Sequence, residues 1–125
     1  MPLVHNDVFD AALDEVATAT QVSAGTGTAP TVYAASYTGE LGTYTLTAGD
    51  GNGDWTIADG DTSGRKLTLS AQSGNNGTAT GSCDWLAFDD GATLLLVIDG
   101  DGDTINSGAA WTITATNVYE IRDPT

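Results

Sequence analysis

Two short acidic segments are the places where residue type and spacing could bind a cation. Residues 99–103, DGDGD, place a carboxylate at every second position, and residues 50–54, DGNGD, nearly repeat that pattern. Oxygen ligands at alternate positions surround Ca²⁺ at the start of an EF-hand loop. Asp99, Asp101 and Asp103 are therefore candidate ligands for a Ca²⁺ site of low affinity.

Neither acidic segment completes the EF-hand pattern. Counting from Asp99, the sixth position is Thr104 rather than glycine, and the twelfth is Ala110 rather than glutamate. The segment that begins at Asp50 departs at the same two positions. Because Asp, Asn and Gly are also the residues from which tight turns are built, we favour two structural turns and expect no required metal or cofactor.

The sequence offers no recognisable catalytic set. His5 is the only histidine and Cys83 the only cysteine, so a serine, cysteine or lysine nucleophile has no plausible partner base. Pairs such as Asp89 with Asp90 follow from composition in a chain with seventeen Asp and Glu residues. The glycine-rich acidic segments carry no Lys-Ser or Lys-Thr for a phosphate loop. We therefore expect a protein without enzymatic activity.

The net charge limits the classes of partner, and the length limits the number of domains. Seventeen acidic residues against three basic ones give a net charge of −14 at pH 7. Such a charge repels nucleic acids and anionic membranes, and we expect neither as a partner. The 125 residues predict a single domain, residues 1–125. The aliphatic run at residues 94–98 is too short to span a bilayer.

The first element expected to position these residues is a short N-terminal helix. Asn6 or Asp7 can cap it, and acidic side chains near its start suit the helix dipole. Its apolar side chains fall on one stripe: Phe9, Ala12, Leu13 and Val16. We assign residues 1–20 to this helical segment. A helix this short is not stable alone, so we expect the stripe to dock on the rest of the domain.

The remaining residues, 21–125, alternate apolar and polar side chains with the period of β-strands. The clearest strand is residues 65–71, where Leu67, Leu69 and Ala71 face one side. Asn and Gly in residues 73–77 predict a tight turn. Further strands are expected over residues 21–24, 31–38, 42–48, 78–88, 93–99 and 111–121. These elements predict an all-β fold, an antiparallel β-sandwich or jelly-roll-like domain with one short N-terminal helix.

Three details of this sheet prediction concern its interior. Residues 49–64 are expected to form a long loop that Trp55 and Ile57 pin to the sheet. The continuous aliphatic run within residues 93–99 predicts a strand in the interior, covered on both faces. In the last strand, we expect these side chains to share one face: Trp111, Ile113, Ala115, Tyr119 and Ile121.

Four segments, in order along the chain, resemble a family of small structural proteins from the virions of tailed bacteriophages. They are HNDVFDAALD (5–14), ADGDTSGRKLTLSAQSG (58–74), GTATG (77–81) with the strand after it that ends in DG (90–91), and YEIRDPT (119–125). The resemblance implies a part of the virus particle that is present in many copies and assembled in the host cytoplasm. It also implies that the partners are the major capsid protein and further copies of this chain.

Three functions are compatible with these observations. Small size, acidity and the resemblance favour a capsid decoration or cement protein. A tail- or fibre-associated virion protein is the first alternative. The second, from another class, is a calcium-dependent carbohydrate-binding module that would use Trp55, Trp85 or Trp111 as stacking platforms. Tryptophans on strands lie more often in the core, which weighs against that module.

Overall fold

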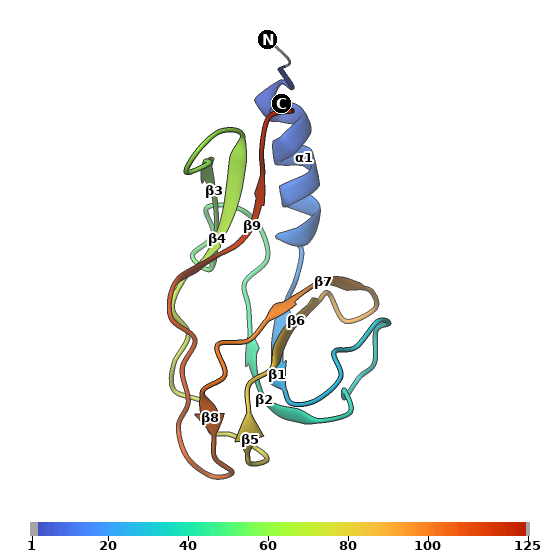
Figure 1. Ribbon diagram of the computed structural model, residues 1–125, viewed down its shortest axis with the longest axis vertical. Coiled ribbons are helices and arrows are strands. Elements are labelled where there is room, and N and C mark those ends of the chain that lie inside the picture. Colours follow the sequence, from blue (N-terminus) through green and yellow to red (C-terminus); the bar gives the residue numbers. More distant parts are fainter. Residues whose placement is uncertain (1–2, 125) are drawn as a thin grey trace.

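The computed structural model describes residues 3–124, which form one helix and nine strands (Figure 1). The elements are α1 (Asn6–Val16), β1 (Gln21–Gly25), β2 (Glu40–Thr45), β3 (Trp55–Asp59), β4 (Arg65–Leu69), β5 (Gly81–Ser82), β6 (Trp85–Asp89), β7 (Leu94–Asp99), β8 (Thr104–Ile105) and β9 (Thr116–Ile121). Sheet A has the order β2-β1-β6-β7, sheet B has the order β3-β4-β9, and β5 pairs with β8. All these pairings are antiparallel, which confirms the expected fold class.

Helix α1 is held on the sheets by its apolar stripe and by one ion pair. His5 is the N-cap, and its Nδ1 accepts a hydrogen bond from the Asp7 backbone N–H at 3.2 Å. Phe9 and Leu13 are buried, whereas Ala12, expected on the same stripe, is exposed. Arg65 on β4 donates from Nε to Asp10 on α1 at 2.7 Å. The helix therefore lies against sheet B as part of the folded body (Figure 1).

Both sheets and the helix contribute to one hydrophobic core. Leu13 of α1, Val22 of β1 and Leu67 of β4 are fully buried in it. The rings of Trp55 on β3 and Phe88 on β6 pack 5.5 Å apart and join the two sheets. The interior thus depends on contacts between segments that are far apart in the sequence.

Residues 31–38 were expected to form a strand, but they belong to a loop that covers the outer face of sheet A. Tyr37 is buried there, where its hydroxyl donates to Asp89 Oδ2 at 2.8 Å and its ring meets Trp85 edge-on at 6.0 Å. At the other end of the loop, Asp84 Oδ2 accepts from the Gly27 N–H at 2.7 Å. Burial and the Asp89 carboxylate raise the pKa of Tyr37 well above its ordinary value.

Strand β6 lies in the interior of sheet A and is fully buried on both faces, whereas β7 lies at the edge of the sheet and is only partly covered. Every residue of β6 is buried, with Leu86 and Phe88 in the main core and Trp85 and Ala87 in a second cluster around Tyr37. Strand β7 lies at the edge of sheet A, and its five aliphatic residues are only half-buried. The prediction of an interior strand at residues 93–99 is wrong because an aliphatic run shows burial by side chains, not the position of a strand in its sheet.

Two further predictions about sheet B are corrected. Residues 55–59, expected within a long loop, form β3, in which Trp55 pairs with Leu69 of β4. In β9, an irregularity opposite Leu67 turns Val118 into the core and leaves Tyr119 47% exposed. Tyr119 therefore does not share the face of Trp111, because the extra residue shifts the alternation by one position.

Candidate functional site

The acidic turn at residues 50–54 uses its carboxylates to hold the fold. Asp54 Oδ2 accepts from the Thr47 N–H at 2.7 Å, and its Oδ1 accepts from Ser70 and Gln72 at 3.2 and 3.0 Å. Asp50 Oδ1 accepts from the Ile57 N–H at 2.8 Å. Burial alone would raise the pKa of Asp54, but these hydrogen bonds outweigh it and hold the pKa below its ordinary value.

The acidic turn at residues 99–103 is fixed by its backbone and leaves most of its carboxylates free. The Gly102 N–H donates to the Cys83 carbonyl, and the Cys83 N–H donates to the Asp103 carbonyl, both at 2.9 Å. Asp101 Oδ1 accepts from the Asp103 N–H at 2.9 Å. Within residues 3–124, the Asp99 and Asp103 carboxylates accept no hydrogen bond. This turn therefore has acceptor groups that the fold does not use.

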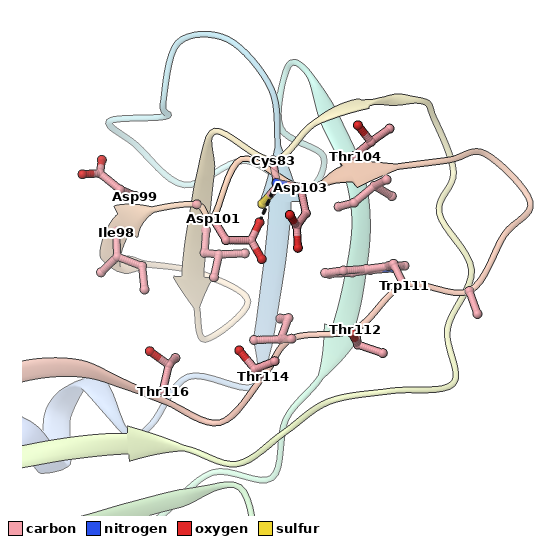
Figure 2. A pocket seen from close by; sticks show the side chains of 15 residues that line it. Cys83, Ile98, Asp99, Asp101, Asp103, Thr104, Trp111, Thr112, Thr114 and Thr116 are labelled. Atoms are coloured by element: carbon pink, nitrogen blue, oxygen red, sulfur yellow. Dashed lines mark hydrogen bonds between the residues drawn. The ribbon is translucent and has the colours of Figure 1, made fainter.

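A cavity of about 360 Å³ lies beside this second turn, at the end of β7 (Figure 2). Asp101 and Asp103 point into it, whereas Asp99 points away. The opposite wall comes from the segment that leads into β9 and from the first residue of that strand, and it includes the alternating Thr112, Thr114 and Thr116. Its apolar lining consists of Leu86, Ile98, Ile105, Ala110, Trp111 and Ile113. The cavity thus combines an apolar floor, carboxylates on one wall and threonine side chains on the other.

Trp111 is fixed in this cavity by strand β2. Its carbonyl accepts a hydrogen bond from the Tyr44 hydroxyl, and the two rings pack 4.6 Å apart. A Cβ atom at Gly42 would lie 2.6 Å from Trp111 Nε1, so only glycine lets the indole lie this close to the strand. The ring is thereby a rigid part of the cavity lining.

The structure separates the three candidate Ca²⁺ ligands. Because Asp99 points away from Asp101 and Asp103, alternate spacing does not bring three carboxylates to one point. Across residues 3–124, no group of three or more His, Cys, Asp or Glu side chains is placed to hold a metal ion. The two converging carboxylates suit a cationic group that carries its own hydrogen-bond donors.

Cys83 also lines the cavity, as a buried thiol. Burial raises its pKa, and the nearby Asp101 carboxylate raises it further. Its Sγ lies 3.7 Å from the Trp85 carbonyl, to which it donates. A thiol held neutral in this way is a poor nucleophile and serves as a small apolar residue.

Sequence reasoning found the acids of this cavity but missed its apolar and threonine walls. Trp111 was expected on one face of the last strand, with a stacking platform as the less favoured role, and all three tryptophans are at least nine-tenths buried. The strict alternation of Thr112, Thr114 and Thr116 was the signal that could have marked the opposite wall.

Comparison with protein-family models, curated proteins and solved structures finds no match for this chain. Within residues 3–124, no helix is long and apolar enough to span a membrane.

Proposed function

We propose that the protein is a non-enzymatic structural protein of a tailed-bacteriophage virion, bound to the capsid as a decoration or cement protein. The four segments described above support the virion assignment by their order and their span of the chain. The partners under this proposal are the major capsid protein and further copies of the chain, in a particle assembled in the host cytoplasm.

The exposed apolar surface at the start of α1 is the observation that favours a protein attached to the particle. Leu3 is 78% exposed and Val8 is 60% exposed, while Phe9 and Leu13 anchor the same helix in the core. A helix fixed on one face presents apolar side chains on the other in a defined geometry, as a docking surface does. The acidic remainder keeps the unattached protein soluble.

The burial of the three candidate stacking tryptophans weighs against the carbohydrate-binding alternative. Trp55, Trp85 and Trp111 are 0%, 1% and 7% exposed, so none of them offers an open ring face on which a sugar could stack. The decoration and tail-associated alternatives differ in where the protein sits on the particle.

Substitutions at exposed positions test attachment without removing core residues. We expect Leu3→Ser with Val8→Ser to reduce the number of copies on purified particles, measured by mass spectrometry, with an unchanged melting temperature. Val32→Ser is the matched control, because Val32 is 71% exposed on the loop over sheet A. If the particles retain the double variant and the control in equal numbers, the start of α1 is not the docking surface. Wild-type particles that carry no copies of the protein would contradict the virion proposal. Copies located on the tail in a reconstruction of the particle would favour the tail-associated alternative over capsid decoration.

A further inference from the structure

Within residues 3–124, three of the four edge strands in sheets A and B are either covered by another segment or combine an irregular register with polar side chains. On β2, the Leu41 carbonyl accepts from the Thr78 N–H at 2.8 Å, and on β3 the Trp55 carbonyl accepts from the Gly51 N–H at 2.9 Å. On β9, the irregularity at Val118 and the polar side chains of the strand interrupt the edge. These are the ordinary means by which proteins prevent strand addition.

Strand β7 has one irregularity near its start, at Leu95, because Leu94 pairs with Asp89 and Leu96 pairs with Phe88. From residue 96 to residue 99 its pairing with β6 is regular, and no segment of the described chain covers this part of the edge. Residues 94–98 are aliphatic, and the first charge is Asp99 at the end of the strand. In the part of the chain that the structure describes, no backbone hydrogen bond joins β7 to any segment other than β6. The outward N–H and C=O groups of an edge strand therefore remain without partners, as a template for another strand.

The side chains of β7 make this edge rigid. Leu96 and Ile98 pack on the main core, while Leu94 and Val97 pack on the second cluster around Tyr37. Because side chains on both faces of β7 are anchored, residues 96–99, which follow the irregularity at Leu95, are already extended before any partner arrives. A preformed template lowers the ordering cost of strand addition.

The charges around β7 select the kind of strand that can pair with it. Asp90 lies in the turn before β7, and Asp101 and Asp103 follow its end. A second copy paired antiparallel on β7 would bring these acids against their counterparts, which costs energy. The three basic side chains, Arg65, Lys66 and Arg122, are all ion-paired in or beside sheet B. The complementary charge must therefore come from a different protein.

We infer that the β7 edge binds an extended segment of a basic partner protein, with one Lys or Arg side chain of that segment entering the cavity. The cavity lies at the end of β7, since Ile98 and Asp99 both line it. The aliphatic stem of a Lys or Arg can pack against Ile98 while its cationic head reaches Asp101 and Asp103. This inference does not depend on whether the partner belongs to a virus particle.

The probe for this inference is a short peptide of alternating threonine and valine with arginine at both ends. At saturation, we expect amide hydrogen exchange of the outward amides of β7 to slow at least about tenfold, with no change in β2, β3 or β9. The same peptide with N-methyl groups on its pairing edge is the first control, and glutamate in place of arginine is the second. Both controls should leave exchange in β7 unchanged.

The charge component is tested in the protein itself. We expect Asp101→Asn with Asp103→Asn to weaken peptide binding roughly tenfold in calorimetry at low salt. Asp14→Asn with Glu15→Gln removes the same charge from the exposed face of α1 and should bind like the wild type. Equal binding of the N-methylated peptide, protection at another edge, or an unaffected Asp101/Asp103 double variant would overturn the inference. A dimer of the free chain that the peptide dissociates would replace the basic partner by a second copy.

Discussion

The two acidic turns of this protein have nearly the same sequence and opposite roles. In residues 50–54, Asp54 accepts three hydrogen bonds and Asp50 accepts one, so the carboxylates stabilise β3 and the chain around it. In residues 99–103, Asp101 accepts one hydrogen bond from its own turn, and Asp103 points into a cavity. Only the second turn keeps charge available for another molecule.

The difference comes from the neighbours of each turn. Thr47, Ser70 and Gln72 lie beside the first turn, and all three donate to the Asp54 carboxylate. The second turn follows edge strand β7, and its neighbours donate to its backbone carbonyls rather than to the carboxylates of Asp99 and Asp103. The role of the carboxylates in each turn therefore depends on whether the surrounding chain supplies hydrogen-bond donors for them.

The largest expected difference between the turns is in stability. We expect Asp54→Ala to lower the free energy of unfolding by about 2 kcal/mol, because the Thr47 N–H and the partly buried Ser70 and Gln72 side chains lose a charged acceptor. Asp103→Ala, its counterpart in the second turn, should change it by less than about 0.5 kcal/mol. Urea denaturation of both variants measures this contrast, and equal losses would show that the second turn is also structural.

Acid denaturation should show the same contrast as a pH dependence. The folded-state pKa of Asp54 is lowered, so its contribution is present above the unfolded value, about 3.9, and is lost as the pH falls through the folded value. Unfolding measured from pH 6 downward should therefore have a shallower acid limb in Asp54→Ala than in wild type. An acid limb that Asp54→Ala leaves unaltered would contradict this assignment.

Neutralising the second turn should stabilise the protein slightly. Asp101→Asn with Asp103→Asn keeps the acceptor oxygen for the turn hydrogen bond but removes repulsion in a chain of net charge −14. We expect a gain of about 0.5 kcal/mol at low salt, which disappears near 1 M salt because the Debye length is then about 3 Å. The same change at Asp50 and Asp54 should be destabilising. A loss of stability in the first double variant would refute the contrast.

Calcium should have the smallest effect. The carboxylates of the first turn are occupied, and those of the second do not all converge, so millimolar Ca²⁺ or its chelation should move the melting temperature by less than about 1 °C at constant ionic strength. Differential scanning calorimetry measures this shift. A clear rise that Asp101→Asn with Asp103→Asn abolishes would restore a Ca²⁺ site in the second turn.

The fold class was predictable because strands with one wet face show their alternation. Leu67 and Leu69 are both fully buried, as their spacing predicted. Strand β3 was missed because Trp55 and Ile57 stand among Asp and Gly residues that are typical of loops. The loop at residues 31–38 was assigned to a strand because Val32 and Tyr33 favour β-structure, although Val32 is exposed in the fold.

The cavity was predictable only in part. Asp101 and Asp103 stood out because their spacing is regular, whatever the fold. Trp111 and Ile98 could not be placed beside them, because that contact depends on how the end of β7 meets a segment that follows β8. Edge position is likewise decided by strand order, which local sequence does not encode.

All positive side chains of this protein are carried on or next to sheet B, whereas sheet A and the β5–β8 pair hold none. Sheet A and the β5–β8 pair, with the loops between their strands, therefore present carboxylates that no basic side chain offsets. A cationic partner that approaches this part of the molecule meets uncompensated negative charge, and raising the ionic strength should slow its capture more than it hastens its release.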